Sequence, residues 1–120
     1  MSKVLLIEDE PLTIKIYSTH LQSEGHKVLI ADNGEDGLKL AVGEQPNLIV
    51  LDIMMPKIDG FSLLTEIKSN SKTQKIPVLI YSNLSSEEDI KKAQNLGATD
   101  YLIKSKVTPT QVVEKFKKYL

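Results

Sequence analysis

Short apolar runs alternate with amphipathic segments along the whole chain. The runs predict five strands, at Val4–Ile7, Lys27–Ala31, Leu48–Leu51, Ile76–Tyr81 and Tyr101–Ile103. The segments between and after the runs carry apolar residues three and four positions apart, which is the spacing of one helix face. The pattern therefore predicts five strands alternating with five helices.

The run at Leu48–Leu51 is the most informative of the five. Four consecutive apolar residues are typical of a strand buried on both faces, as found in parallel sheets. Strands that alternate with helices through short connections form a parallel sheet with helices on both faces. We therefore expect an α/β fold, a doubly wound five-stranded parallel sheet, built as a single domain over residues 1–120.

Local signals predict where several helices begin and end. Pro11 and Gly25 are expected to bound the first helix. Ser85-x-x-Glu88 and Thr108-Pro109-x-Gln111 are predicted to be capping boxes that open the fourth and fifth helices. The apolar face expected for the first helix consists of Leu12, Ile16, Tyr17 and Leu21.

Composition excludes several kinds of chemistry. The chain has no cysteine, which rules out disulfides, thiolate catalysis and cysteine-based zinc sites. A net charge of −1 gives no general electrostatic attraction to nucleic acid, and none is expected as a direct partner. The run at Val4–Ile7 is too short for a signal peptide or a membrane span, so no membrane association and a cytoplasmic location are the default expectation.

Polar side chains follow the predicted strands at the points where the strands end. Glu8 and Asp9 follow the first strand, Asp52 follows the third, the fourth ends at Ser82, and Lys104 follows the fifth. In open α/β sheets, ligands bind outside the carboxyl ends of the strands. If the first and third strands are neighbours, three carboxylates converge, and such a cluster raises its own pKa values unless a cation joins it.

These groups are the ones that phosphoryl transfer requires. Carboxylate oxygens suit Mg²⁺, and Asp52 is a possible carboxylate nucleophile. Lys104 and Ser82 can bind phosphoryl oxygens. Each residue also has an ordinary interpretation, since the acids after the first strand can complement a helix N-terminus and Ser82 can begin a turn. Their coincidence at the ends of different strands favours the functional interpretation.

At these motifs the chain resembles the CheY-like receiver domains of two-component response regulators. The resemblance covers Val4 to Leu120, and its two most specific motifs are Leu51–Pro56, followed by Asp59-Gly60, and Gly97–Lys104. A third is the acidic motif Leu5–Glu10. The family implies a flavodoxin-like strand order of 2-1-3-4-5.

The resemblance also implies a role for each acidic residue. Asp52 would accept a phosphoryl group from a histidine kinase or a phosphotransfer protein. Asp9 and Asp52 would bind Mg²⁺ directly, with the backbone carbonyl of Met54 as a third ligand and Glu8 acting through water. The chain would then be a signalling phosphoacceptor rather than an enzyme with its own substrate.

Three further residues would respond to the phosphoryl group. Ser82 and Lys104 would bind its oxygens, and Tyr101 would be the aromatic switch residue. The switch would reshape the face made by the fourth helix, fifth strand and fifth helix, which binds a downstream target protein or an output domain. Without the resemblance, Tyr101 is simply a strand aromatic with its hydroxyl at the surface.

Two positions depart from the family pattern. Ser105 follows the strand-five lysine where the family usually has proline, which predicts a looser loop around Lys104. Asn83 follows Ser82 where the family usually has a small residue, so we expect a narrower access to Asp52 and altered phosphorylation kinetics.

Two alternative functions remain open from the sequence. A Mg²⁺-dependent aspartyl phosphatase of the haloacid-dehalogenase type needs a second Asp two residues after the nucleophile, but Met54 stands there and cannot transfer a proton. A docking module that is never phosphorylated is the other alternative. The sequence is compatible with a stand-alone regulator and with a receiver cut from a longer protein.

Overall fold

Five strands and five α-helices alternate along residues 1–56 and 59–120, the part of the chain that the computed structural model describes. The strands are β1 (Lys3–Ile7), β2 (Lys27–Ala31), β3 (Leu48–Leu51), β4 (Val78–Ser82) and β5 (Asp100–Ile103). The helices are α1 (Pro11–Ser23), α2 (Gly34–Glu44), α3 (Gly60–Ser69), α4 (Glu87–Asn95) and α5 (Pro109–Tyr119), and a 3₁₀ turn spans Lys104–Lys106. The strands pair in parallel in the order β2-β1-β3-β4-β5, which confirms the expected fold and strand order.

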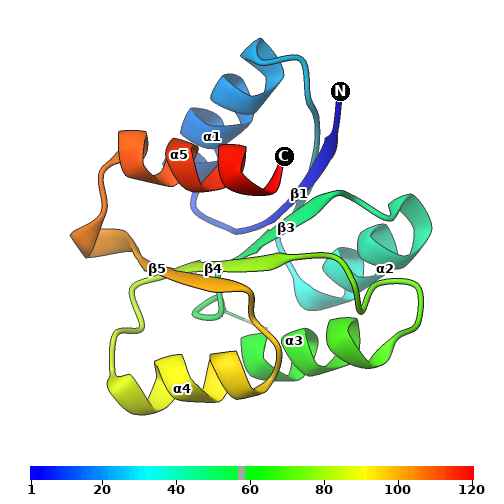
Figure 1. Cartoon of the computed structure of the whole chain (residues 1–120), viewed down its shortest axis with the longest axis vertical. Coiled ribbons are helices and arrows are strands. Elements are labelled where there is room, and N and C mark those ends of the chain that lie inside the picture. The colour runs from blue at the N-terminus through cyan, green and yellow to red at the C-terminus, as the bar shows by residue number, and fades with distance from the viewer. Residues whose placement is uncertain (57–58) are drawn as a thin grey trace.

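The sheet separates two apolar layers. Helices α1 and α5 cover one face, and α2, α3 and α4 cover the other (Figure 1). All four residues of β3 are buried, as expected for a strand enclosed on both faces. Burial of one large aliphatic or aromatic side chain contributes about 1.5–3 kcal/mol. The buried middle of the sheet therefore fixes the positions of the residues that directly follow its strands.

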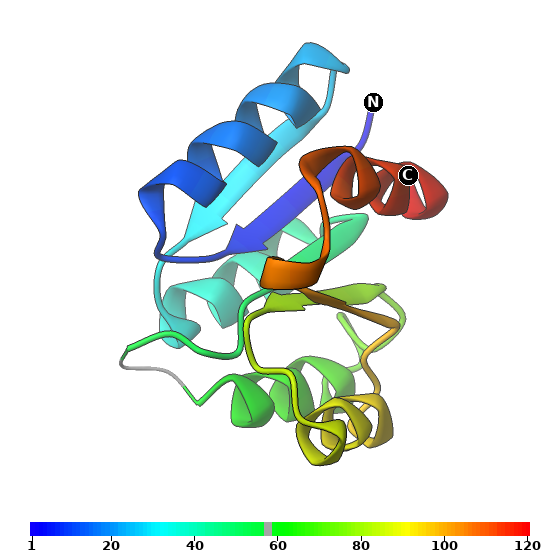
Figure 2. The same ribbon diagram turned by 90° about the vertical axis from the view of Figure 1, so that its left-hand side faces the viewer.

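The register of the strands brings two acidic segments together. Residues Val4–Ile7 of β1 pair with Leu48–Leu51 of β3, so the residues after the two strands are also neighbours. The backbone N–H of Asp52 donates to the carbonyl of Ile7 at 3.0 Å, extending the ladder by one step. Figure 2 shows the arrowheads of β1 and β2, which mark the carboxyl ends of these strands, pointing in the same direction. The expectation that the first and third strands are neighbours is confirmed.

Two of the predicted helix boundaries are confirmed. Gly25 has a φ of +87° directly after the C-cap of α1, a left-handed conformation that glycine adopts without strain. Thr108 caps α5 by accepting from the N–H of Gln111, whose side chain accepts from the N–H of Thr108 in return. Both ends are therefore fixed by local chemistry that the sequence displays.

The predicted cap of the fourth helix is wrong by one residue. Ser86, not Ser85, is the N-cap of α4, and it accepts from the N–H of Asp89 rather than of Glu88. The Ser86 hydroxyl also donates to the Asp89 carboxylate at 2.7 Å. Two serines followed by three acids offer the same spacing twice, so the pattern alone does not distinguish the two registers.

The predicted start of the fourth strand is also wrong. The backbone N–H of Ile76 donates to Thr73 in a turn, and Pro77 has no N–H to give to a ladder. Strand β4 therefore begins at Val78 and not at Ile76.

The predicted apolar face of the first helix is half right. Tyr17 and Leu21 are buried against the sheet, but Leu12 is 64% exposed and Ile16 is 40% exposed. Successive residues are rotated by about 100° around a helix, so Leu12 and Ile16 form a row beside the row of Tyr17 and Leu21. The sheet covers the second row and leaves the first in solvent.

Among the described residues, no helix is both long and apolar enough to cross a membrane.

Candidate functional site

Three carboxylates converge where β1 and β3 end. One oxygen each from Glu8, Asp9 and Asp52 lies within 4.8 Å of the others. Glu8 and Asp52 are buried and Asp9 is exposed, so the cluster has one open side. The convergence that the strand-end pattern predicts is therefore present.

Lys104 reaches into this cluster from the end of β5. Its ammonium donates to the carboxylates of Glu8 and Asp52, the second at 2.9 Å, and Glu10 lies 3.6 Å away. The Lys104 side chain is only 10% exposed. Burial alone would lower the pKa of Lys104, but the hydrogen bonds to Glu8 and Asp52 outweigh burial and raise it. Lys104 therefore keeps its charge at any physiological pH.

The two buried carboxyl groups differ in their affinity for a proton. Burial, the largest effect, raises the pKa of Glu8 to about 7, and the neighbouring Asp52 adds to the rise against the opposing effect of Lys104. Burial, the largest effect, would raise the pKa of Asp52, but the hydrogen bonds from Lys104 and the Met54 N–H outweigh it and lower the pKa of Asp52. Adjacent carboxylates separate their pKa values in this way. Asp52 is thus the ionised member of the pair.

The oxygen atoms of the cluster fit a small divalent cation. Asp52 accepts from the Met54 N–H at 2.8 Å with one oxygen and from Lys104 with the other. Glu8 Oε2 is buried and has no hydrogen-bond partner among the described residues, which in general costs about 1–3 kcal/mol. Mg²⁺ prefers oxygen ligands and keeps several waters. The unpartnered buried oxygen of Glu8 and the exposed carboxylate of Asp9 offer such ligands and leave room for water.

Met54 is 54% exposed, and the hydrogen bond from its backbone N–H to the Asp52 carboxylate holds the Met54 peptide beside Asp52. The predicted ligand is the Met54 carbonyl, and this role stays a prediction.

Ser82 and Tyr101 are linked through one residue of the loop after β4. The Ser82 hydroxyl is buried and accepts from the Leu84 N–H at 3.3 Å, while the Tyr101 hydroxyl donates to the Leu84 carbonyl at 2.5 Å. Burial, followed by the charges of Asp89 and Asp52, raises the pKa of Tyr101 to about 12, so its hydroxyl remains a donor. The sequence gives no signal for Leu84, because its part is played by its backbone.

Ser82 also lies near Lys104 in the sheet. Its partner in the β4–β5 register is Ile103, the residue before Lys104. Asn83 and Ser105, the two departures from the family pattern, are both exposed. Ser105 occupies the middle of the 3₁₀ turn that follows β5.

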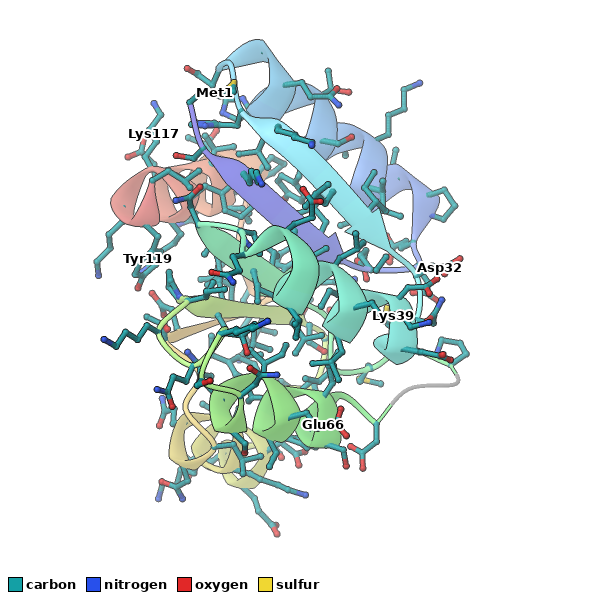
Figure 3. The ribbon with its side chains drawn as sticks, turned by 90° about the vertical axis from the view of Figure 1, so that its right-hand side faces the viewer. Met1, Asp32, Lys39, Glu66, Lys117 and Tyr119 are labelled. Carbon is teal, nitrogen blue, oxygen red and sulfur yellow. The ribbon has the colours of Figure 1, made fainter. Side chains whose placement is uncertain are left out.

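A separate groove of about 600 Å³ lies between α2 and α3, away from this cluster. Figure 3 shows Lys39 on α2 and Glu66 on α3, two of the residues that line it. None of the convergent carboxylates contributes to its walls, so it is not part of the candidate site.

Stability in the absence of a cation is expected to fall as the pH rises from about 5 to about 8. Because the pKa of Glu8 is about 7 in the folded protein and 4.5 ordinarily, the folded state retains a proton that the unfolded state has lost. The free energy of unfolding therefore declines through this window and levels off above it. Urea denaturation of the parent and of Glu8→Gln at each pH measures the effect, since the variant lacks the titrating group.

As the pH rises, the free energy of unfolding of the parent should fall relative to that of Glu8→Gln. Saturating Mg²⁺ should reduce that fall. Parallel curves for the two proteins without a cation would contradict the assignment of the raised pKa to Glu8.

Comparisons with known proteins show which family the chain matches. The model of the response regulator receiver domain family matches residues 4–117. PilH of Pseudomonas aeruginosa is 36% identical over 104 residues, which are 87% of this chain and 86% of PilH. Several other curated relatives are transcriptional regulators, and the chain spans less than half the length of each.

Two solved structures are similar over nearly their whole length. The chemotaxis protein CheY4 of Vibrio cholerae has a TM-score of 0.90 and 27% identity, covering 100% of this chain and 99% of CheY4. The Mn²⁺-bound form of the response regulator Rcp1 has a TM-score of 0.83 and 27% identity, covering 99% of this chain and 94% of Rcp1.

Proposed function

This chain belongs to the response regulator receiver domain family of two-component systems, and from that membership we propose that Asp52 is its phosphoacceptor. The observation that carries the proposal is the state of Asp52. It is a carboxylate with a lowered pKa, held against Lys104 at 2.9 Å, where the strands of a parallel sheet end. A carboxylate nucleophile must be ionised, and the lowered pKa and the fixed position of Asp52 beside Lys104 support this role.

The proposed donor is a phosphohistidine of a histidine kinase or of a phosphotransfer protein. An oxygen of Asp52 attacks the phosphorus, the bond from phosphorus to the imidazole nitrogen breaks, and the imidazole leaves with the bond's electron pair. The product is an acyl phosphate on Asp52. Lys104 then pairs with a phosphoryl oxygen instead of with the free carboxylate.

We propose Mg²⁺ as the cation of this site, held by Asp9, Asp52 and the Met54 carbonyl directly and by Glu8 through water. When bound, it supplies positive charge that neutralises the phosphoryl oxygens. The fit of the carboxylate oxygens and the unpartnered Glu8 Oε2 support the proposal. The Mn²⁺-bound form of Rcp1, a protein of the same fold, is consistent with it.

We propose that the output passes from Ser82 to Tyr101 through Leu84. A phosphoryl oxygen on Asp52 attracts the Ser82 hydroxyl away from the Leu84 N–H, and the Tyr101 hydroxyl holds the carbonyl of the same residue. The displaced loop then reshapes the face formed by α4, β5 and α5. A downstream target protein or an output domain would bind this face, and the chain itself would act as a signalling switch in the cytoplasm rather than as an enzyme.

Intact-mass analysis after incubation with acetyl phosphate tests the proposal. One phosphoryl adduct is expected in Mg²⁺ and none in the presence of a chelator. Borohydride reduces an aspartyl phosphate to homoserine, and peptide mapping should locate that change at position 52. An absent adduct on a protein that binds Mg²⁺ would favour the docking module, whereas continuous release of phosphate from simple phosphoesters would favour the phosphatase.

Asn83→Ala is expected to change the phosphorylation kinetics. Asn83 is exposed and adjoins Ser82, where a smaller side chain opens the approach to Asp52. We expect the rates of adduct formation and of adduct loss both to rise several-fold, as measured by a time course of intact mass. Asn95→Ala, which shortens an exposed asparagine at the end of α4, is the control. Equal rates for Asn83→Ala and the parent would refute the prediction.

A further inference from the structure

Tyr81 lies directly under the ammonium group of Lys104. It is the residue of β4 before Ser82, its side chain is buried, and the Lys104 Nζ is 5.4 Å from the centroid of its ring. An ammonium within about 6 Å of an aromatic centroid is attracted by the negative face of the ring. Lys104 therefore has an aromatic contact in addition to its carboxylate partners.

The Tyr81 ring is itself held by other aromatic residues. The hydroxyls of Tyr81 and Tyr17 share a hydrogen bond of 3.1 Å, and the two rings meet edge to face at 86° with centroids 5.5 Å apart. Tyr17 in turn meets Phe116 of α5 at 82°, with centroids 5.6 Å apart. Burial, then the contact with Tyr81, raises the pKa of Tyr17, which keeps this hydroxyl protonated. The ring thus has a fixed position set by α1 and α5.

The other contacts of Lys104 are with groups that the proposed reaction occupies. Glu8 and Asp52 are candidate cation ligands, and Asp52 is also the group that becomes phosphorylated. Glu10 is exposed, and its Oε2 lies 3.6 Å from the Lys104 Nζ. Lys104 directly follows the edge strand β5 and begins the 3₁₀ turn. Lys104 thus contacts three carboxylates and one aromatic ring. The ring of Tyr81 is buried, and neither the proposed cation nor the phosphoryl group would occupy it.

We propose that Tyr81 is a positioning residue, which keeps the Lys104 ammonium aimed at Asp52 when the carboxylates are engaged elsewhere. It touches no reacting atom and acts through Lys104. The inference deepens the proposed function, because the phosphoryl oxygens on Asp52 are what the positioned ammonium would meet.

Chemical reactivity of Lys104 measures its positioning without any phosphorylation. Acetic anhydride is applied to the folded protein in saturating Mg²⁺, and peptide mass mapping follows acetylation at each lysine. Tyr81→Leu should raise the rate at Lys104 several-fold over the parent, while rates at exposed lysines stay the same. Tyr81→Phe keeps the ring and should stay close to the parent. Phe116→Leu removes the aromatic residue that packs on the Tyr17 ring, which in turn packs on the Tyr81 ring, and it should leave the Lys104 rate unchanged.

The same variants are then phosphorylated with acetyl phosphate. Tyr81→Leu should form the adduct about tenfold more slowly, and Tyr81→Phe should restore most of the parent rate. A Lys104 acetylation rate in Tyr81→Leu equal to that of the parent would overturn the proposal. An equal rise in Phe116→Leu would also overturn it, because general loosening of the core would then explain the result.

A measurement on the parent protein covers the case in which Tyr81→Leu does not fold. Protons above an aromatic face resonate upfield, so the Lys104 Cε protons should show this shift with and without Mg²⁺. Disappearance of the shift when Mg²⁺ is added would overturn the proposal. If the parent forms no phosphoryl adduct, the proposed function fails, while the acetylation and resonance results still decide whether Tyr81 positions Lys104.

Discussion

Replacing Asp52 with asparagine is expected to reduce the formation of the phosphoryl adduct by at least about a thousandfold. The amide keeps the shape of the side chain, and its oxygen can still accept from the Met54 N–H. An amide is not a nucleophile toward phosphorus, however, and it lacks the charge that pairs with Lys104 at 2.9 Å. Intact mass after incubation with acetyl phosphate and Mg²⁺ is the measurement.

Asp59→Asn is the matched control for this prediction. Asp59 is exposed and caps α3 by accepting from the N–H groups of Phe61 and Ser62, a role that asparagine fills equally well. This variant should carry the adduct at the parent level. An undiminished adduct on Asp52→Asn would show that another carboxylate, such as Glu8 or Asp9, is the acceptor.

Gly60→Ala is expected to lower the free energy of unfolding by about 3 kcal/mol or more. A Cβ atom at Gly60 would lie 2.4 Å from the Cα and 2.5 Å from the Cβ of Ile53, and a backbone atom has no freedom to move aside. Ile53 directly follows Asp52, so the displacement would be passed to Asp52, the proposed acceptor. We therefore expect the molecules that remain folded to form the adduct more slowly as well. Urea denaturation measures the first effect and the mass time course the second.

Gly43→Ala separates this contact from a general effect of alanine in a helix. Gly43 lies in α2, where a Cβ atom would meet nothing within 4 Å. Its replacement should raise the free energy of unfolding by about 0.4–1 kcal/mol, because alanine restricts the unfolded chain. If Gly60→Ala were as stable as the parent, the close approach of α3 to Ile53 would not exist in solution.

The fold and the convergence of the acids could be predicted because both follow from local patterns. The apolar runs set the strands, the topology sets their neighbours, and the residue after each strand then has a defined place. Two of the errors occurred where one pattern allows two outcomes. Ser85 and Ser86 offer the same capping spacing, and α1 carries two adjacent apolar rows of which the sheet covers one.

The electrostatics of the site could not be predicted from the sequence, because they depend on distances. Glu8 and Asp52 follow similar apolar strands, yet burial outweighs the contact with Lys104 and raises the pKa of Glu8, whereas the hydrogen bonds from Lys104 and the Met54 N–H outweigh burial and lower the pKa of Asp52. The contact of Lys104 with the ring of Tyr81 joins a residue of β4 to the residue that directly follows β5. A tyrosine in a strand gives no indication that a lysine 23 positions later lies over it.

The residues of the site follow strands that are expected to differ in rigidity, because β3 is central in the sheet and β5 is at its edge. Strand β3 has hydrogen-bonded neighbours on both sides and side chains buried on both faces, so its amide protons should exchange with deuterium only when the whole domain unfolds. Strand β5 is an edge, and its amides should exchange through smaller local openings. Asp52 therefore directly follows the strand expected to exchange most slowly, whereas Tyr101 lies in, and Lys104 directly follows, a strand expected to open more easily. Under the proposed function, the phosphoacceptor would thus be fixed in place, while the residues proposed to respond to it would keep the freedom to move.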